Sequence, residues 1–407
     1  MEIKREMKRR EFLTATATAA TLAAAGPLVA QSAATSQASA AAATPPASAP
    51  AQSSAAYPAP TEVKKLEVMN LRELEAAAQK VIPPGGFGYI SSAAGDEWTK
   101  RENEAAFKRV TIEPRYLTGN DDADHSTTLL GAKLSMPIIT SVMGGHGLGH
   151  VSAEAGTAKG AHAAGTLFTT GSQSTLPLEE IAQASPGPKW FQIYMPPDQG
   201  KARDLLLRAK AAGYLAVVLT IDAFVSSNRE TDQRNRFRSP LPYGNFPGQA
   251  RGYGSSPFKT NLSWDDVAFI QKVTGLPVLI KGVMSAQQAA EAVEHGCAGI
   301  QVSNHGGRSL DDVPATITAL PRIADAVRGR IAIVMDGGVR RGQDVFKALA
   351  LGANAVALGR PVMYGLALGG WMGVQSVLEH LRDELQMTMR LAGVKSIGEI
   401  TRGHLFA

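Results

Sequence analysis

The feature that most constrains the fold of this chain is a series of eight short apolar runs that starts at residue 137. The runs are rich in valine and isoleucine and do not alternate apolar with polar residues, which is typical of parallel strands buried on both faces. Segments with helical patterns separate them, each closed by a glycine or a charge cluster. The runs cover residues 137–142, 165–169, 190–195, 215–221, 277–281, 299–302, 331–335 and 355–358.

Alternation of strands and helices over roughly 230 residues predicts an α/β fold, a (β/α)8 TIM barrel. A doubly wound open sheet is the alternative, but no G-x-G-x-x-G motif follows the first run. We expect residues 61–130 to form a helical cover before the barrel. The long Pro/Gly-rich excursion at 229–263, after the fourth run, is expected to be an inserted lid loop.

The first 60 residues are expected to lie outside the catalytic fold. Arg9 and Arg10 precede a short Ala/Thr-rich stretch, so residues 1–30 are predicted to be a twin-arginine (Tat) signal peptide that uses the Tat translocon. A disordered Ala-rich tail is the alternative. Residues 31–60 carry no charge and are rich in Ala, Ser and Pro, which predicts a linker. Residues 61–407 would form the barrel domain, exported to the bacterial periplasm or secreted.

Composition excludes several other functions. The formal charge of +5 over 407 residues is mild and dispersed, which argues against nucleic-acid binding. Cys297 is the single cysteine, so an internal disulfide is impossible. His146 and His150 lie four residues apart in a Gly-rich loop, where packing is the expected role, and no metal site is predicted.

Polar residues cluster where the predicted strands end and the following loops begin. In TIM barrels these ends carry the catalytic groups, so the side chains should converge on one rim. In chain order they are Val142, Met143 and Gly144; Gln192 and Tyr194; Thr220, Asp222 and Arg229; Lys281; Ser303, His305 and Arg308; Asp336, Gly337, Gly338, Val339 and Arg340; and Gly359 and Arg360.

Two of these loops have a clear chemical character. In the loop VSNHGGR, His305 can exchange a proton near neutral pH and Arg308 can grip a carboxylate, while the glycines allow close approach to a flat group. The loops DGGVRRG and GRP follow the seventh and eighth strands, the phosphate-binding corner of many barrels. Lys281 could be a Schiff-base lysine or a fixed cation beside a cofactor.

The motifs VSNHGGR, DGGVRRG, ALGRP, KWFQIYM, LTID and IKGV resemble those of the FMN-dependent L-2-hydroxy-acid oxidase and dehydrogenase family, the glycolate oxidase family. The stretches VIPPGGFGYISSAAGDEWTKREN and GLALGGW are similar to the L-lactate oxidases within it. The resemblance runs from about residue 65 to the C-terminus. It implies a TIM barrel, an FMN cofactor, a small 2-hydroxy-acid substrate and a homotetramer.

The resemblance also implies catalytic and substrate-binding roles. His305 would be the base that takes a proton as the substrate's α-hydrogen passes to the flavin N5, and Asp222 would hold its imidazole. Tyr194 would hydrogen-bond the substrate hydroxyl. The substrate carboxylate would be bound by Tyr89, Arg229 and Arg308.

A second group of residues would bind the cofactor. Lys281 would stabilise the anionic reduced flavin ring. Gln192, Thr220 and Ser303 would lie around the flavin head, and Asp336 would meet the ribityl chain. The phosphate would be bound by Gly338, Arg340, Gly359 and Arg360, and the remaining cofactor contacts would come from Val142, Met143, Gly144, Gly337 and Val339.

Four residues depart from the family pattern, namely Val142, Gly144, Gly171 and Gln173, where relatives often carry proline, alanine, serine and an aromatic residue. These positions would lie around the substrate or the accessible edge of the flavin, so substrate size and the electron acceptor stay open. The expected acceptor is O2, which gives H2O2; a quinone or cytochrome is the alternative, and a Schiff-base lyase using Lys281 is a remote one. Tyr243 and Tyr253 are both candidates for a lid tyrosine.

Overall fold

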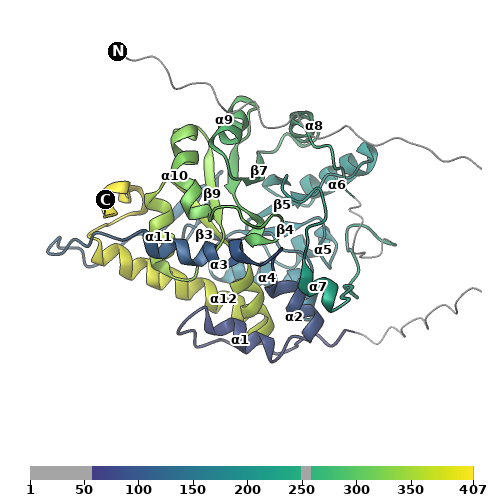
Figure 1. Ribbon diagram of the computed structural model, residues 1–407, viewed down its shortest axis with the longest axis horizontal. Coiled ribbons are helices and arrows are strands. Elements are labelled where there is room, and N and C mark those ends of the chain that lie inside the picture. Colours follow the sequence, from purple (N-terminus) through teal and green to yellow (C-terminus); the bar gives the residue numbers. More distant parts are fainter. Residues whose placement is uncertain (1–56, 249–257, 407) are drawn as a thin grey trace, which may run out of the picture. The chain divides into compact units, whose positions relative to one another are not determined.

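The computed structural model describes residues 57–248 and 258–406. The predicted signal peptide and most of the predicted linker therefore lie outside the described residues, as does Tyr253. Figure 1 shows the strands gathered at the centre with helices around them. Within the described part of the chain, no helix combines the length and the apolar character needed to cross a membrane.

The centre of the fold is a sheet of eight parallel strands in the order β3-β10-β9-β8-β7-β6-β5-β4. Pairing of the first predicted strand with the last excludes the open doubly wound sheet. The seam between β3 and β4 is also bridged, since the Thr140 N–H donates to the Leu167 carbonyl at 3.1 Å. The strands are β3 Ile138–Thr140, β4 Phe168–Gly171, β5 Lys189–Ile193, β6 Ala216–Thr220, β7 Val278–Val283, β8 Gly299–Val302, β9 Ala332–Asp336 and β10 Ala355–Leu358.

Successive residues of each strand are buried in two different places. In β6, Val217 and Leu219 pack against the surrounding helices, whereas Ala216 and Val218 point into the barrel interior. This period of two explains why the strands are mostly apolar at successive positions, because neither face meets water. The interior is therefore a packed core, and a site has to form at an end of the barrel.

A helix covers the barrel after each strand. Helix α9 illustrates the local signals, because the Ser285 Oγ accepts the backbone N–H of Gln288 at its start and Gly296 follows its end with φ +67°. The outer helices are α4 Ala153–Ala163, α5 Leu178–Gln183, α6 Gln199–Ala211, α8 Trp264–Thr274, α9 Ala286–Glu294, α10 Thr316–Val327, α11 Gly342–Ala350 and α12 Arg360–Leu391, and the short α7 Glu230–Arg234 lies in the excursion after β6.

The helical cover predicted at 61–130 is only partly right. Helices α1 Glu73–Gln79, α2 Pro84–Ser91 and α3 Trp98–Ala105 precede the barrel. Strands β1 Thr127–Leu129 and β2 Ala132–Leu134, however, form an antiparallel hairpin. Leu129 and Leu134 join the interior cluster, so the hairpin closes the end of the barrel at which the strands begin. That leaves the opposite end for the site.

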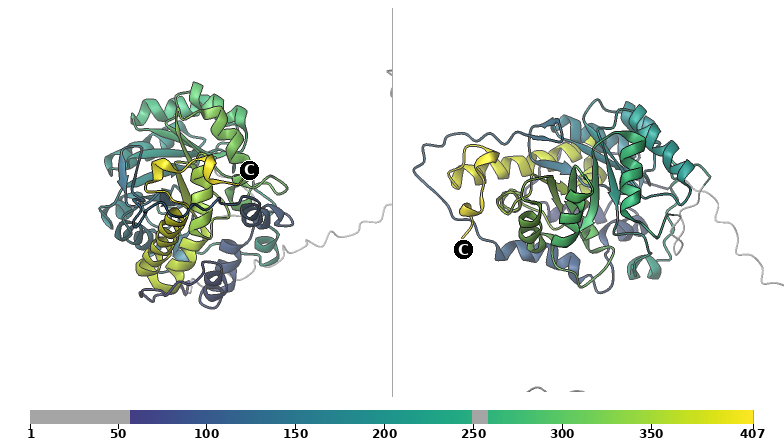
Figure 2. Two further views of the ribbon diagram at one scale, coloured as in Figure 1. Left: turned by 90° about the vertical axis from the view of Figure 1, so that its left-hand side faces the viewer. Right: turned by 90° about the horizontal axis from the view of Figure 1, so that it is seen from above.

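Segments from the two ends of the described part of the chain lie together. Figure 1 shows α1 and α2 beside α12. In Figure 2 the blue segment that follows α3 runs beside the yellow C-terminal segment, where Ile112 and Leu405 form an isolated antiparallel bridge. The segment before α1 also contacts α12, since the Lys64 N–H donates to the Gly369 carbonyl at the kink of that helix.

Strand boundaries differ from the predictions in ways that the backbone explains. The run 165–169 was expected to be strand from its start, but Gly165 has φ +73° and forms the turn before β4. Strand β7 runs past Lys281 to Val283 through a bulge at Gly282, where φ is +113°. A Cβ at Gly282 would lie 2.7 Å from the Asp222 Cβ, so this glycine lets the ends of β6 and β7 approach.

Candidate active site

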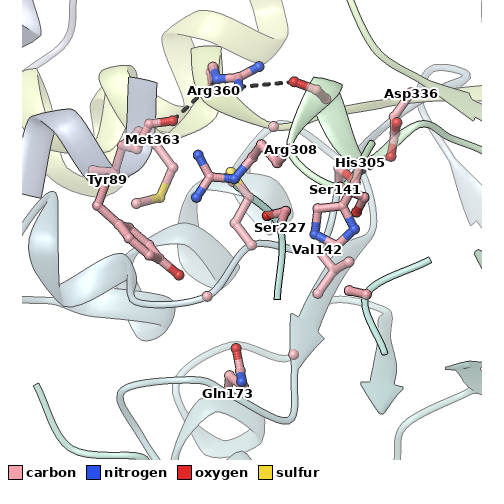
Figure 3. Close-up of a pocket in the computed structure, with 18 of the residues that line it drawn as sticks. Tyr89, Ser141, Val142, Gln173, Ser227, His305, Arg308, Asp336, Arg360 and Met363 are labelled. Carbon is pink, nitrogen blue, oxygen red and sulfur yellow. Dashed lines mark hydrogen bonds between the residues drawn. The ribbon is translucent and has the colours of Figure 1, made fainter. Parts of the chain in front are cut away.

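A cavity of about 300 Å3 opens at the ends of the strands, on the rim predicted from the sequence (Figure 3). Three of the predicted site residues, Thr220, Asp222 and Ser303, lie behind its wall and not on it. The predicted residues that line it are Tyr89, Val142, Met143, Gly144, Gln192, Tyr194, Arg229, Lys281, His305, Arg308, Asp336, Gly337, Gly338, Val339, Arg340, Gly359 and Arg360.

The imidazole of His305 faces this cavity and is held from behind. Its Nδ1 lies 2.8 Å from Asp222 Oδ1 and 3.4 Å from Lys281 Nζ. The carboxylate is the nearer partner and can only accept, so we assign the proton to Nδ1. Nε2 is then the nitrogen that carries a lone pair and is available to a substrate.

His305 also has an unusual backbone conformation. Its φ is +58°, a left-handed conformation that costs free energy for a residue with a side chain. Ser303 supports it, since the Ser303 Oγ accepts the His305 backbone N–H at 3.1 Å. The strain indicates that the position of the imidazole matters more than local stability, and it gives Ser303 a role in placing the loop.

Burial, with the charge of Lys281, keeps His305 neutral. Burial and, after it, the charge of Lys281 hold the pKa of His305 below its ordinary value, although Asp222 opposes the shift. Burial alone would raise the pKa of Asp222, but Lys281 and His305 hold it below its ordinary value. The pair is therefore a neutral imidazole backed by a carboxylate, which can accept a proton and then stabilise the resulting cation.

Two arginines and a tyrosine meet at one wall of the cavity. The guanidinium carbons of Arg308 and Arg229 lie 5.1 Å and 5.8 Å from the centre of the Tyr89 ring. Figure 3 shows Arg308 between Tyr89 and His305. Burial and then the charge of Arg229 lower the pKa of Arg308 to about 10. Two cations this close favour an anion between them, and a carboxylate matches their planar donors.

Sequence reasoning missed Asp232, which also lines this part of the cavity. Its side chain is 3% exposed, and its Oδ2 lies 3.8 Å from Arg229 Nη1. Burial raises the pKa of Asp232, and the two arginines oppose that shift. Asp232 thus supplies a buried counter-charge to the arginine pair. The charged sequence ETDQR around it is typical of an exposed helix and hid this role.

Helix α3, outside the barrel, holds two of the loops. Asn103 and Asn304 exchange two side-chain hydrogen bonds of 2.9 and 2.8 Å. A Cβ at Gly307 would lie 2.8 Å from the Lys100 backbone nitrogen, and one at Gly338 would lie 1.9 Å from the Asn103 carbonyl oxygen. The glycines of both loop motifs are thus needed for close packing against α3, and sequence reasoning missed Asn103.

Arg340 and Arg360 form the corner predicted to bind a phosphate. Arg340 pairs with Glu104 at 2.8 Å. Arg360 donates to the Ile90, Ser92 and Gly306 carbonyls at 3.2, 2.9 and 3.0 Å (Figure 3). Burial, together with the charge of Arg340, lowers the pKa of Arg360, so an anion at this corner would relieve the repulsion.

A buried acid occupies the wall next to this corner. Asp336 Oδ2 accepts from Ser141 Oγ at 3.1 Å and from Gln301 Nε2 at 2.7 Å. Its Oδ1 has no hydrogen-bond partner among the described residues, although buried polar atoms are normally paired. A hydroxyl of a ribityl chain would satisfy it. Together with the two arginines, this unpaired oxygen shows that the wall fits a cofactor with a polyol chain and a phosphate, as FMN has.

The opposite end of the cavity is assembled from loops. Gln173 Nε2 and Tyr243 OH lie 3.5 Å apart, and Tyr243 packs edge-on against Phe246. Tyr194 stacks on Phe258 with ring centres 5.0 Å apart, and burial raises its pKa. Of the two candidate lid tyrosines, Tyr243 lines the cavity. In the described part of the chain, no group of three His, Cys, Asp or Glu side chains could hold a metal ion.

Comparison with known proteins gives consistent matches. A model of the family described as FMN-dependent dehydrogenase matches residues 78–407. Glycolate oxidase of Spinacia oleracea is 44% identical over 356 residues, which are 84% of this chain and 96% of that protein. Glycolate oxidase 3 of Arabidopsis thaliana is 43% identical over 354 residues, with shares of 84% and 96%.

Solved structures agree with these matches. A Pediococcus acidilactici protein described as a lactate oxidase superimposes with a TM-score of 0.83 at 42% identity, covering 86% of this chain and 98% of that chain. A mandelate oxidase structure has a TM-score of 0.77 at 36% identity, with shares of 83% and 98%. Both similarities extend over nearly the whole of the known proteins.

Proposed function

Because this chain belongs to the FMN-dependent dehydrogenase family, we propose that its substrate is L-lactate or a somewhat larger L-2-hydroxy acid, oxidised to the 2-oxo acid with O2 as acceptor. It is an FMN-dependent 2-hydroxy-acid oxidising enzyme, and its cofactor is FMN. The observation that carries the proposal is the neutral His305, backed by Asp222 and facing the same cavity as Arg229 and Arg308.

The roles of the residues follow from their positions. Arg229 and Arg308 bind the substrate carboxylate, and the ring of Tyr89 contacts both guanidiniums. When the carboxylate is bound, Nε2 of His305 accepts a proton from the substrate, and Asp222 stabilises the imidazolium that forms. Tyr194 lines the cavity and can hydrogen-bond the substrate hydroxyl. When bound, FMN supplies the two-electron acceptor, and Lys281 contributes a fixed positive charge to that site.

The size of the substrate is inferred from the loops opposite the arginines. A Cβ at Gly144 would lie 3.6–3.8 Å from three atoms of Gln173, ordinary contact distances. Gly144 therefore leaves room for about one methyl group, bordered by a polar amide. The relatives named above are described as glycolate, lactate and mandelate oxidases, so the family accepts side groups of several sizes.

Two experiments test the proposal. Purified protein should be yellow and should release FMN and not FAD on denaturation; a colourless protein, or FAD, would refute the cofactor assignment.

Anaerobic L-lactate should bleach the flavin absorbance, and O2 should restore it with formation of H2O2. Reduction of an artificial electron-accepting dye without O2 consumption would instead favour the dehydrogenase alternative, with a quinone or cytochrome as acceptor. The Schiff-base lyase alternative for Lys281 is not supported by the family to which the chain belongs.

We also propose that the chain is exported by the Tat route and assembles as a homotetramer. The support for export is the Arg9-Arg10 pair followed by the Ala/Thr-rich stretch. Replacing both arginines by lysine should keep the enzyme inside the cell, whereas unchanged export would exclude the route. The mass measured by light scattering tests the tetramer.

A further inference from the structure

Two methionines face the cavity in which peroxide would form. Met143 and Met363 line it, whereas Met69 and Met387 are 78% and 47% exposed at the surface and do not line it. A thioether is the side chain, after cysteine thiolate, that peroxides oxidise most readily. Cys297, the single cysteine, is buried, and burial raises its pKa to about 11, so its reactive thiolate is scarce.

The two cavity methionines differ in access. Met363 is 1% exposed, and its methyl group packs close to Gly149, 3.6 Å from where a Cβ on that glycine would lie. Met143 is partly exposed and follows the end of β3. Its sulfur lies 3.7 Å from the position of a Cβ on Gly359, so it spans from the end of β3 to the end of β10. Of the two cavity methionines, Met143 is therefore the more exposed.

We propose that Met143 is a site of sulfoxidation by the enzyme's own H2O2, an inference that rests on the proposed use of O2. The sulfur lone pair attacks one peroxide oxygen, the O–O bond breaks, and the products are methionine sulfoxide and water. The thioether is oxidised by two electrons and the peroxide is reduced by two, so no further reactant is needed. Peroxide released inside the cavity meets this sulfur before it reaches the solvent.

Oxidation of Met143 would disturb the cavity from within. Met143 packs against the apolar core, and its sulfur reaches from the loop after β3, which also carries Gly144, to Gly359 at the end of β10. A sulfoxide is polar and branched, so it no longer suits this position. Turnover would thus inactivate the enzyme in proportion to the number of catalytic cycles and not to the time of incubation.

The test compares peroxide made in the cavity with peroxide added from outside. The holoenzyme turns over L-lactate in air with excess catalase, and peptide mass spectrometry measures the sulfoxide at each methionine. Because catalase removes only the peroxide that escapes, Met143 should be oxidised about fivefold or more above Met69. Added H2O2 without substrate should reverse the order, since exposure then decides.

Variants give a second readout. Met143→Leu should lose a smaller fraction of its own initial rate per cycle than the wild-type enzyme, and Met69→Leu, the matched surface control, should decay like the wild type. Release of H2O2 with Met143 oxidised no more than Met69 would overturn this inference and leave the oxidase function intact. Turnover without any H2O2 would overturn both.

Discussion

The two ends of the cavity are built differently. At the end that carries His305, Arg340 and Arg360, side chains are fixed by bonds such as the 2.8 Å contact between His305 and Asp222 and the three carbonyls that hold Arg360. At the other end, the cavity is lined by side chains of two loops, with Gln173 Nε2 3.5 Å from Tyr243 OH, and the same loops are joined behind them by bonds such as the 2.9 Å one from the Gly244 N–H to the Ser174 carbonyl. The residues of the first end follow directly after strands and are supported by α3, whereas the residues of the second end lie in loops.

This difference indicates that one end of the cavity provides catalysis and the other determines which substrate fits. The base, the carboxylate clamp and the cofactor corner need fixed positions, because catalysis depends on distances of a few tenths of an ångström. The loop end needs only to leave a space of the right size and polarity, so it can vary without loss of the reaction. Changes at the first end should therefore affect rate, and changes at the second should affect selectivity.

The largest effect is expected at the base. His305→Gln should slow reduction of the flavin by roughly 10²-fold or more, because a general base contributes about 10²–10⁴. FMN should still bind, since the corner of Arg340 and Arg360 is untouched. Anaerobic stopped-flow absorbance measures the rate, and the flavin-to-protein ratio is the control. Reduction at the wild-type rate would show that His305 is not the base.

A smaller effect is expected at the carboxylate clamp. Arg308→Lys replaces a planar pair of donors by a single point of charge and loses the contact with Tyr89. Charge-assisted hydrogen bonds contribute about 1.5–3 kcal/mol, so KM should rise roughly ten- to a hundredfold while kcat changes less. Steady-state kinetics with L-lactate measures both. A fall in kcat with constant KM would mean that Arg308 acts on the reaction step and not on binding.

At the loop end only selectivity should change. Gly144→Ala adds a methyl group in contact with Gln173, and one such group is worth about 1–3 kcal/mol of discrimination. The wild type should accept 2-hydroxy acids longer than lactate with comparable kcat/KM, and the variant should shift toward lactate. The measurement is kcat/KM from L-lactate to L-2-hydroxyoctanoate in both proteins. If the wild-type value already falls steeply beyond lactate, Tyr243 and its neighbours close the space.

The smallest effect is a shift in pH dependence. The active form of His305 is neutral and its pKa is lowered, so flavin reduction should stay constant as the pH falls through the ordinary histidine range near about 6.5 and decline only below it. In Lys281→Met the decline should begin at higher pH, because the positive charge that lowers the pKa of His305 is removed. Rates of anaerobic reduction from pH 5 to pH 8, about three units around that value, provide the profile. A decline in the wild type that begins above the ordinary histidine value would contradict a lowered pKa.

Much of the barrel could be predicted from the chain because its signals are local. Runs of apolar residues without alternation indicated all eight strands, and the segments between them indicated helices. The resemblance to a family named the polar residues at the strand ends, and the structure brings nearly all of them to one cavity. Their individual catalytic roles stay predictions until variants are measured.

What the sequence did not reveal depends on contacts between distant segments. Asp232 is surrounded by other charges, and only burial against Arg229 distinguishes it from a surface residue. The hairpin of β1 and β2 has strands of three residues each, too short for a periodic pattern. Asn103 ends the stretch VIPPGGFGYISSAAGDEWTKREN, but nothing in that stretch indicates its partner, because Asn304 lies 201 positions further along the chain.

Asn103 has a consequence for how the protein fails on heating. Its side chain holds the loop of His305, and its backbone fits against the Gly338 loop of the cofactor corner. One short helix outside the barrel thus connects the base and the cofactor corner into a single cooperative unit. When α3 detaches, both loops lose their support together. Flavin release, followed by its fluorescence, and thermal inactivation should then share one midpoint, well before the barrel itself unfolds.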